Sequence, residues 1–281
     1  MPELPEVETM VRGVRPAIER AVLVECQRTA CHCRPIVIQP SLAAIRRRVL
    51  GKRCSQVSRL GKRILLRFET GDCFVIEPRM TGLLLTAAPP DVEHLRFSWT
   101  WEHPASIKPR RQTVLFWDRR GLGQIRLVTT NELEKLQQTL GPDPLKMSVT
   151  DWRSVVAQTS RPIKVALLDQ ALVAGIGNLY ASEILHLAKI SPVRPANSLS
   201  AEQLARLSSA VLKILNTAIQ YEGSTLGDGT YRNALNQTGS YQNQHTVYDR
   251  AGEMCPDCRR DQIVRIVQAQ RSTFYCLRCQ K

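Results

Sequence analysis

Pro2-Glu3-Leu4-Pro5-Glu6-Val7-Glu8-Thr9 is the stretch that organises this chain, and it begins the first predicted helix. Proline suits the first helical turn, where its missing N–H costs nothing, and the glutamates suit the positive end of the helix dipole. Apolar residues then recur at the i, i+3, i+4, i+7 spacing of a helix that buries one face: Val7, Met10, Val11 and Val14.

The chemical interest of this stretch lies in Pro2. A small residue after Met1 permits removal of the methionine, which would leave Pro2 with a free secondary amine. A terminal amine has a pKa of about 8, against about 10.4 for lysine, so more of it is unprotonated and nucleophilic at neutral pH. Attack on a sugar C1′ would form an iminium, with Glu3 as the adjacent acid or base. Most such termini are ordinary, so the stretch alone does not establish catalysis.

The charge balance indicates a nucleic-acid partner. The 281 residues include 39 Lys and Arg against 25 Asp and Glu, a net charge of +14, and phosphate neutralisation is the commonest use of such an excess. The length allows two domains. No run of 18 apolar residues suggests a membrane span, and the N-terminus lacks the apolar region of a signal peptide. We therefore expect a cytoplasmic protein without membrane contact.

Two cysteine pairs near the C-terminus predict a metal site. Cys255-x2-Cys258 and Cys276-x2-Cys279, with 17 residues between them, have the spacing of a zinc ribbon. Four thiolates close a tetrahedral site with no open position, so one structural zinc is expected rather than a catalytic one. A segment this short needs the metal to fold, and the residues between the pairs are typical of a hairpin with Arg271 at or near its turn.

The remaining cysteines lie in the first quarter of the chain. The total of nine is odd, which argues against a disulfide framework in a cytosolic protein. Cys31-His32-Cys33 has the residue types of a metal site, but no second ligand pair lies near it in the sequence. We therefore interpret it as a loop or strand with free thiols.

The first half of the chain predicts strands. Leu95, Phe97, Trp99 and Trp101 alternate with polar residues, and Thr70-Gly71-Asp72 is typical of a hairpin turn. About seven short strands with one leading helix indicate an antiparallel β-sandwich. The predicted strands are 21–27, 53–59, 62–69, 73–77, 94–101, 113–117 and 124–128.

The second half predicts helices. Gly141-Pro142-Asp143-Pro144 marks the domain boundary, and helices are expected over 131–140, 150–158, 162–172, 179–188 and 200–221. Gly175-Ile176-Gly177-Asn178 lies between two helices. It is either an interhelical turn or a helix N-terminus that offers N–H groups to a phosphate, with Lys164 aimed at the same anion. Residues 223–244 are rich in Gly, Asn, Gln, Ser and Thr and predict a long mobile loop.

Taken together, these motifs resemble the bacterial formamidopyrimidine-DNA glycosylases of the Fpg/Nei family. The resemblance covers essentially the whole chain, and the segments that carry it are Pro2–Thr9, Leu60–Lys62, Arg79–Gly82, Leu140–Leu145, Lys164–Gln170, Gly175–Glu183 and Gln270–Cys276. It implies an α+β fold: 1–140 as a catalytic β-sandwich domain with an N-terminal helix, 141–149 as a linker, 150–244 as a helix-two-turn-helix DNA-binding domain with a lesion-capping loop, and 245–281 as a zinc ribbon.

The resemblance also implies an activity, the excision of oxidised purines followed by strand nicking. Pro2 would be the nucleophile that forms the Schiff base, and Glu3 would help to open the sugar. Lys62 matches a lysine that assists β-elimination, and Arg271 matches a hairpin arginine that grips the lesion's phosphates and is linked to δ-elimination. The implied DNA contacts are His94 (by position only), Arg120, Lys164 and Asn178.

An enzyme that flips a base out of the stack must fill the hole that it leaves. The resemblance assigns this wedge role to Met80, Arg120 and Leu122. The chain departs from the family pattern here: Glu77-Pro78-Arg79 stands where His-Leu-Gly is usual, and Arg119-Arg120-Gly121-Leu122 stands where Pro-Arg-Arg-Phe is usual. The departures bear on lesion preference and leave the catalytic end intact.

The resemblance further implies a monomer that acts on double-stranded DNA with a damaged base, located in the cytoplasm with the nucleoid, without an organic cofactor. Two alternatives remain. One is a Nei-type glycosylase that prefers oxidised pyrimidines, and the other is a non-catalytic protein that binds damaged DNA on the same scaffold. Leu4-Pro5-Glu6-Val7 and Met80 favour the purine enzyme over the first alternative. Intact Pro2, Glu3 and Lys62 argue against the second.

Overall fold

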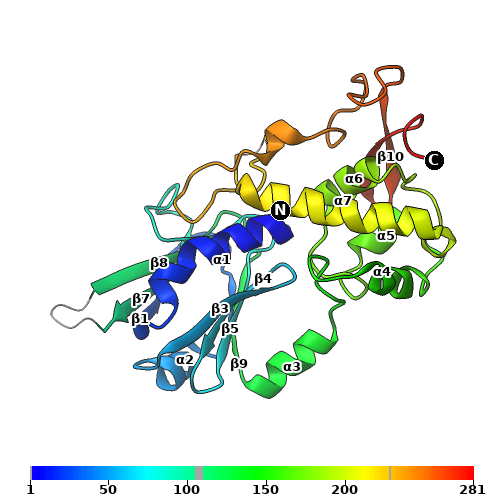
Figure 1. The fold of residues 1–281 in the computed structure, drawn as a ribbon. Helices are drawn as coiled ribbons and strands as arrows, with labels where there is room; N and C mark the ends of the chain where they lie inside the picture. Colours follow the sequence, from blue (N-terminus) through cyan, green and yellow to red (C-terminus); the bar gives the residue numbers. More distant parts are fainter. Residues whose placement is uncertain (1, 105–109, 228) are drawn as a thin grey trace. The chain divides into compact units, whose positions relative to one another are not determined.

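The computed structural model describes residues 2–104, 110–227 and 229–281. Met1 lies outside the described residues, so its predicted removal stays a prediction. The chain divides into two compact units, which are described separately (Figure 1). The first comprises residues 1–138 with 221–242, and the second comprises 139–220 with 243–281. In the described parts of the chain, no helix is long and apolar enough to cross a membrane.

The first unit is a β-sandwich with a leading helix, as the sequence predicted. One sheet has the order β1-β7-β8-β6 and the other β2-β9-β5-β4-β3. Every pairing is antiparallel except that of β2 with β9, which is parallel. The strands are β1 (Val22–Arg28), β2 (Val37–Gln39), β3 (Cys54–Leu60), β4 (Arg63–Phe68), β5 (Cys73–Glu77), β6 (Gly82–Leu85), β7 (Leu95–His103), β8 (Arg110–Asp118) and β9 (Gln124–Val128), and the helices are α1 (Leu4–Ile18), α2 (Leu42–Val49) and α3 (Thr130–Gln138).

The sequence did not predict β2, α2 or β6, and for the two strands the reason is physical. β2 has only three residues. β6 is buried on both faces, so it lacks the alternation that marks a half-exposed strand. In β7 the alternation of apolar and polar residues suggests that the polar residues face solvent. Arg96 and Ser98 are nevertheless only 3% and 8% exposed. Arg96 is accommodated because its Nε donates to the carbonyl oxygen of Asp118 at 2.8 Å.

Helix α1 supplies the core on which the first unit depends. Its apolar stripe is fully buried in one cluster with Phe74, Trp99 and Trp101 of the sheets. Phe74 and Trp99 meet edge to face with ring centroids 5.7 Å apart, a geometry that adds to the burial energy of both rings. Figure 1 shows α1, in blue, beside the strands of this unit. The periodicity of the opening stretch thus predicted both the helix and its buried face.

Residues 221–242 pack on α1 within the first unit. Most of the segment is irregular, as predicted for 223–244, and it ends in the 3-10 turn Tyr241–Gln244. The segment is anchored by its side chains: Ala234 and Tyr241 are 2% and 1% exposed. Gly13 of α1 admits this packing, because a Cβ at that position would overlap the Cβ of Ala234.

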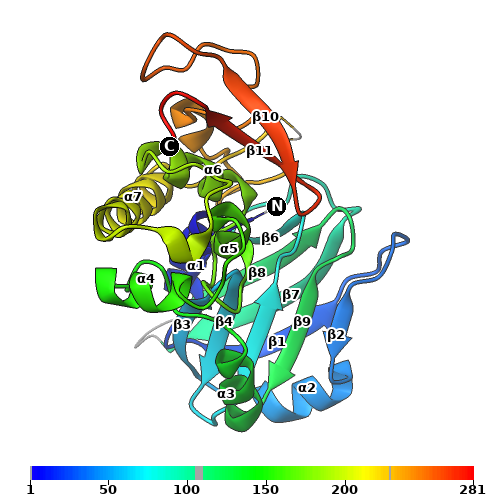
Figure 2. The same cartoon turned by 90° about the vertical axis from the view of Figure 1, so that its right-hand side faces the viewer.

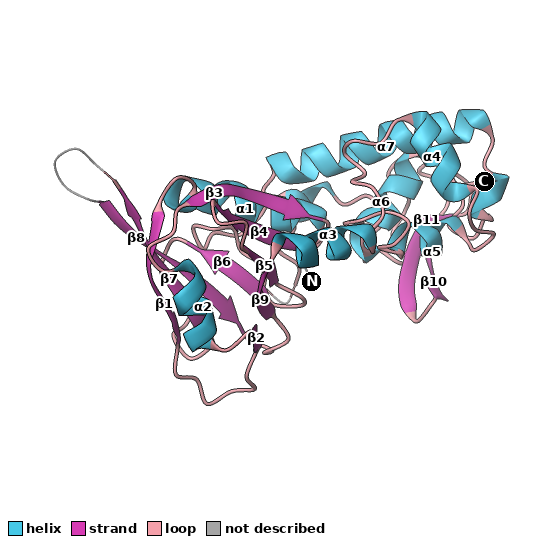
Figure 3. Ribbon diagram, turned by 90° about the horizontal axis from the view of Figure 1, so that it is seen from below, coloured by secondary structure: helices cyan, strands magenta, loops and turns pink. Residues whose placement is uncertain are grey.

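The second unit consists of helices and a hairpin. Figure 3 shows its helices in cyan, and Figure 2 shows the hairpin next to α6. Its helices are α4 (Val149–Val156), α5 (Ile163–Leu168), α6 (Asn178–Leu187) and α7 (Ala201–Gln220), with a 3-10 turn at Ala196–Ser198, and its strands are β10 (Ile263–Gln268) and β11 (Arg271–Cys276). α5 ends four residues earlier than the predicted 162–172, because the Asp169 carboxylate accepts from the N–H of Ala171 at 2.9 Å and turns the chain.

The hairpin turn places Arg271 where the sequence predicted. Ala269 and Gln270 both have positive φ, 46° and 60°, as the two central residues of the tight turns that join antiparallel strands require. Arg271 is therefore the first residue of β11 and pairs with Gln268 of β10. Its side chain is exposed at the end of the hairpin.

We expect two glycine substitutions in the first unit to differ in cost. Gly121 and Gly51 both have positive φ, 61° and 73°. Alanine in this conformation costs about 1–2 kcal/mol. A Cβ at Gly51 meets nothing within 4 Å, whereas one at Gly121 would overlap the carbonyl oxygen of Arg34. Urea unfolding should show that Gly121→Ala lowers the free energy of unfolding by about 1–3 kcal/mol more than Gly51→Ala, and equal losses would contradict this packing.

Candidate active site

Pro2 and Glu3 are held in place although they stand at the end of the chain. Both are buried, and Glu3 is only 5% exposed. The Glu3 N–H donates to Oε2 of Glu6 at 2.8 Å, which caps α1. The other carboxylate oxygen of Glu6 accepts from the N–H of Ser224 at 3.0 Å. One carboxylate therefore ties the first residues of α1 to the 221–242 segment of the same unit.

Lys62 lies in the turn between β3 and β4, and Glu8 helps to shape that turn. Arg59, whose side chain is 5% exposed, donates from Nε to Glu8 at 3.1 Å. It also donates from Nη1 to the carbonyl oxygen of Gly61 at 3.0 Å. The opening stretch thus orders both the residues proposed for nucleophilic attack and the turn that carries Lys62.

Asp118 organises the residues assigned to the wedge. Its fully buried carboxylate accepts from Thr81 Oγ1, from the N–H of Arg120 at 3.2 Å and from the N–H of Gly123 at 2.7 Å. Thr81 follows Met80, which is 37% exposed after β5. The structure therefore joins the Met80 turn to the turn that carries Arg120 and Leu122.

Two of the residues that depart from the family pattern at 77–79, Glu77 and Arg79, belong to an ion-pair cluster. Glu77 is 5% exposed. Three guanidinium groups lie 3.0 Å from its carboxylate, those of Arg63, Arg79 and Arg126. Arg79 has a φ of 56°, a conformation that glycine adopts without strain, and glycine is the residue usual in the family at this position. The ion pair with Glu77 compensates for an arginine there.

His94 is oriented by a carboxylate. Its Nδ1 lies 2.9 Å from Oδ1 of Asp91, which also accepts from Trp117 Nε1 at 3.2 Å. Burial opposes the charge on Asp91, but hydrogen bonds from the His94 backbone, the His94 ring and Trp117 outweigh it and hold the pKa of Asp91 below its usual value.

In the second unit, Lys164 and Asn178 are in direct contact. The Lys164 ammonium donates to Asn178 Oδ1 at 2.6 Å and to the carbonyl oxygen of Ser272 at 3.3 Å. The lysine is fully buried, so these bonds offset the cost of burying its charge. Lys164 thereby links α5, the start of α6 and the strand that begins with Arg271.

The turn before α6 is fixed by Gln170. Its Oε1 accepts from the N–H of Gly175 at 2.9 Å, and its Nε2 donates to the carbonyl oxygen of Ile176 at 3.0 Å. Gly177 is the N-cap of α6, and Asn178 is its first residue. The motif is therefore both an interhelical turn and a helix N-terminus.

The four C-terminal cysteines fit a zinc ion. Their ligand atoms lie within 4.8 Å of one another. Two Sγ–Sγ distances, Cys255 to Cys279 and Cys258 to Cys276, are 3.7 Å, against about 3.8 Å for the edge of a tetrahedron with Zn–S bonds of about 2.3 Å. All four positions are taken by protein ligands, so the site is structural, as the spacing predicted.

Glu183 of α6, a residue that the sequence analysis did not single out for a role, holds the segment before the ribbon. Its carboxylate accepts from the N–H groups of Thr246, Val247 and Tyr248 at 2.9, 3.0 and 2.8 Å. Glu6 and Asp118 belong to the same class, since each is a buried carboxylate that accepts backbone N–H groups. For Glu6 a signal was present, a glutamate three residues after a helix N-cap. Asp118 and Glu183 had no comparable signal.

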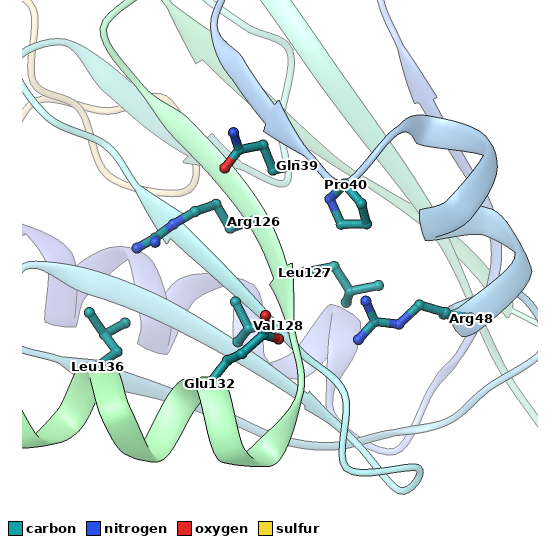
Figure 4. Close-up of a pocket in the computed structure, with 8 residues that line it drawn as sticks. All are labelled: Gln39, Pro40, Arg48, Arg126, Leu127, Val128, Glu132 and Leu136. Carbon is teal, nitrogen blue, oxygen red and sulfur yellow. The ribbon is translucent and has the colours of Figure 1, made fainter.

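A separate pocket opens in the first unit between β9, α2 and α3 (Figure 4). Arg48, Arg126 and Glu132 are among its lining residues, and Figure 4 shows their side chains around the hollow. None of its eight lining residues is a residue that the sequence analysis assigned to catalysis, DNA contact or metal binding. The pocket is therefore not part of the candidate site.

A β-sandwich with a buried proline at position 2, a helical unit with an asparagine at a helix N-terminus and a four-cysteine hairpin define the class of helix-two-turn-helix DNA glycosylases with a zinc finger. Three family models match in order: the formamidopyrimidine-DNA glycosylase N-terminal domain over residues 1–125, its H2TH domain over 140–229 and the zinc finger found in FPG and IleRS over 252–281. The chain belongs to the formamidopyrimidine-DNA glycosylase family, which confirms the resemblance stated from the motifs.

Relatives and solved structures agree with this assignment. The formamidopyrimidine-DNA glycosylase of Chloroflexus aggregans is 38% identical over 286 residues, covering 100% of this chain and 98% of the relative. That of Thermus thermophilus is 37% identical, with the same coverage. The crystal structure of the Thermus thermophilus MutM (Fpg) protein superposes with a TM-score of 0.83 at 35% identity over 99% of this chain and 98% of that one. The Lactococcus lactis Fpg in complex with DNA containing an abasic site gives 0.82 at 29% identity, with 99% of each chain covered.

We expect Cys276→Ser to lose the zinc that the wild type retains through dialysis. A hairpin of this size depends on its metal, so amide hydrogen exchange over 263–276 should rise to the rate of unstructured peptide. Strands β4 and β5 of the first unit should keep their protection. Cys73→Ser, which alters a buried thiol of the first unit, is the control that keeps the zinc. A Cys276→Ser protein with undiminished zinc would contradict the assignment.

Proposed function

We propose that this chain is a bifunctional DNA glycosylase and AP lyase. It excises oxidised purines, 8-oxoguanine and formamidopyrimidines, from double-stranded DNA and then cleaves the strand by β,δ-elimination. The observation that carries the proposal is the buried, capped N-terminus: Pro2 precedes a Glu3 that is fixed by Glu6, in a chain that matches the family over its whole length.

The chemistry uses the processed amine of Pro2. Its nitrogen attacks C1′ of the damaged nucleotide, the glycosidic bond breaks, and Glu3 supplies or accepts the proton that opens the sugar. The resulting iminium acidifies the C2′ proton. Loss of that proton, assisted by Lys62, expels the 3′ phosphate, and a second elimination linked to Arg271 expels the 5′ phosphate. The zinc only holds the hairpin that presents Arg271, because all four of its positions are taken by cysteine.

The damaged base must leave the stack before Pro2 can reach C1′. Met80, Arg120 and Leu122 fill the space that it leaves. What supports this is that Asp118 joins the Thr81 and Arg120 turns into one rigid element, since an inserted side chain has to resist the stacking that it replaces. Leu122 offers a smaller stacking surface than the usual aromatic residue, so opposite-base preference is where this chain should differ from its relatives.

The DNA backbone is held by groups of both units. In the second unit, Asn178 stands at the positive end of α6, Lys164 fixes its amide, and Arg271 is exposed on the hairpin. In the first unit, Asp91 fixes the ring of His94, and Arg120 lies in the wedge turn. The net charge of +14 supplies the general attraction. The protein acts as a monomer in the cytoplasm, with the nucleoid.

Borohydride trapping on a duplex with 8-oxoguanine tests the nucleophile. We expect a covalent adduct with the wild type, a strongly reduced one with Pro2→Gly, and retention of the adduct in Lys62→Ala, because Lys62 acts after the Schiff base has formed. Pro5→Ala is the matched control, since it changes the other proline of the opening stretch and should still give the adduct.

The same assay separates the alternatives. Preferential trapping on thymine glycol would support a pyrimidine enzyme. Absence of any adduct with protein shown to lack Met1 would leave only a binding function.

The proposed phosphate contacts predict that the affinity for DNA falls steeply as the salt concentration rises. Each neutralised phosphate contributes about −0.9 to the slope of log K against log salt. Arg271→Gln should therefore reduce the magnitude of the slope by about 1, whereas Arg153→Gln, an exposed arginine on α4, should leave it unchanged. Fluorescence anisotropy with a labelled abasic-site duplex measures both slopes. A wild-type affinity independent of salt would exclude phosphate contacts as the basis of binding.

A further inference from the structure

The fold supplies what the sequence around Cys31-His32-Cys33 lacked, a second pair of metal ligands. Glu93 and His94 come from the loop before β7, about sixty residues further along the chain. The ligand atoms of Cys33, Glu93 and His94 lie within 4.8 Å of one another. The Sγ of Cys33 is 3.7 Å from Oε1 of Glu93, against about 3.6 Å for the matching edge of a zinc tetrahedron. We propose that these three residues form a second binding site for a thiophilic divalent cation of the zinc type.

The surroundings of the cluster suit a metal. Asp91 accepts from Nδ1 of His94 at 2.9 Å, so Nε2 is the nitrogen that would bind the metal, and metal-bound histidines are commonly oriented by such a carboxylate. A metal on Nε2 would replace the DNA contact proposed for His94, so the two uses of this ring exclude each other. One thiolate and one carboxylate balance the two charges of the cation. Glu93 is exposed, and Cys33 and His94 are partly exposed, so an ion can enter.

Cys31 shapes the loop that carries Cys33. Its Sγ accepts from the N–H of Cys33 at 3.4 Å and from Nη1 of Arg96 at 2.7 Å, and it donates to the carbonyl oxygen of Glu93 at 2.9 Å. The first bond shapes the 31–34 loop, and the other two tie that loop to the 93–96 segment. Cys33 and the Glu93–His94 pair are thus already brought together by groups that are not ligands in the proposed site.

The site also adjoins the turn assigned to the wedge. Arg96, which holds Cys31, donates from Nε to the carbonyl oxygen of Asp118 at 2.8 Å. The carbonyl oxygen of Arg34 lies against Gly121 so closely that a Cβ there would overlap it. The glycine that replaces an arginine of the family pattern is therefore explained by the 31–34 loop. A metal bound at Cys33 would stabilise the 31–34 loop, which packs against the turn that carries Arg120 and Leu122.

A cobalt titration of the full-length protein tests the site without DNA, so its outcome is independent of the proposed function. The four-cysteine site is first filled with one equivalent of Zn²⁺, which leaves the second site empty because four thiolates bind zinc more tightly, and Co²⁺ does not readily displace that zinc because it binds such ligands more weakly. Added Co²⁺ should then give a near-ultraviolet thiolate-to-cobalt band with the wild type and none with Cys33→Ser. Cys73→Ser, the change at a buried thiol elsewhere in the unit, should keep the band.

A second variant and a second readout distinguish loss of metal binding from misfolding of the protein. Glu93→Gln keeps the size of an exposed side chain, so the protein should fold. The substitution should raise the Co²⁺ dissociation constant about tenfold or more, since loss of even an outer-shell partner lowers metal affinity by that factor. Excess Zn²⁺ should raise the Tm of the wild type and not that of Cys33→Ser. No cobalt band in the wild type, or a band that survives in Cys33→Ser, would overturn the proposal.

Discussion

The hydrogen bond between the Glu3 N–H and the Glu6 carboxylate is the constraint on which the proposed chemistry depends. The first residues of a chain are ordinarily mobile, whereas a nucleophile must be held close to its target. In this chain the Glu6 carboxylate accepts from the N–H of Glu3 at 2.8 Å, which caps α1, and from the N–H of Ser224 at 3.0 Å. The apolar stripe of α1 is buried in the core of the sandwich. Glu3 is therefore anchored both to α1 and, through Glu6, to the 221–242 segment.

Buried carboxylates play this part throughout the molecule. Asp118 joins the two turns of the wedge, and Glu183 holds the segment before the zinc ribbon to α6. Each accepts backbone N–H groups that would otherwise be buried without partners, and such charge-assisted bonds are stronger than neutral ones. Loops that carry functional residues gain rigidity in this way without being part of a helix or sheet. Glu77 differs from these carboxylates, because its partners are the side chains of three arginines, at the point where the chain departs from its relatives.

The sequence predicted the features that depend on local patterns. The helical period of α1, the bounds of β5 and β9, and the four zinc ligands follow from periodicity, turn residues and spacing. It could not predict features that arise from pairing between distant segments. β2 is too short to carry a pattern and is fixed by its parallel pairing with β9, and the 221–242 segment is ordered by contacts with α1. The proximity of Cys33 to Glu93 is likewise a product of the fold.

The proposed chemistry requires that the Pro2 nitrogen becomes a free amine and forms the covalent intermediate. Tandem mass spectrometry of the tryptic N-terminal peptide, after borohydride reduction on a duplex with 8-oxoguanine, tests it most directly. We expect a peptide that begins at Pro2 and carries the reduced sugar on its terminal nitrogen. A peptide that retains Met1 in protein that still forms the adduct, or a sugar on Lys62, would contradict it.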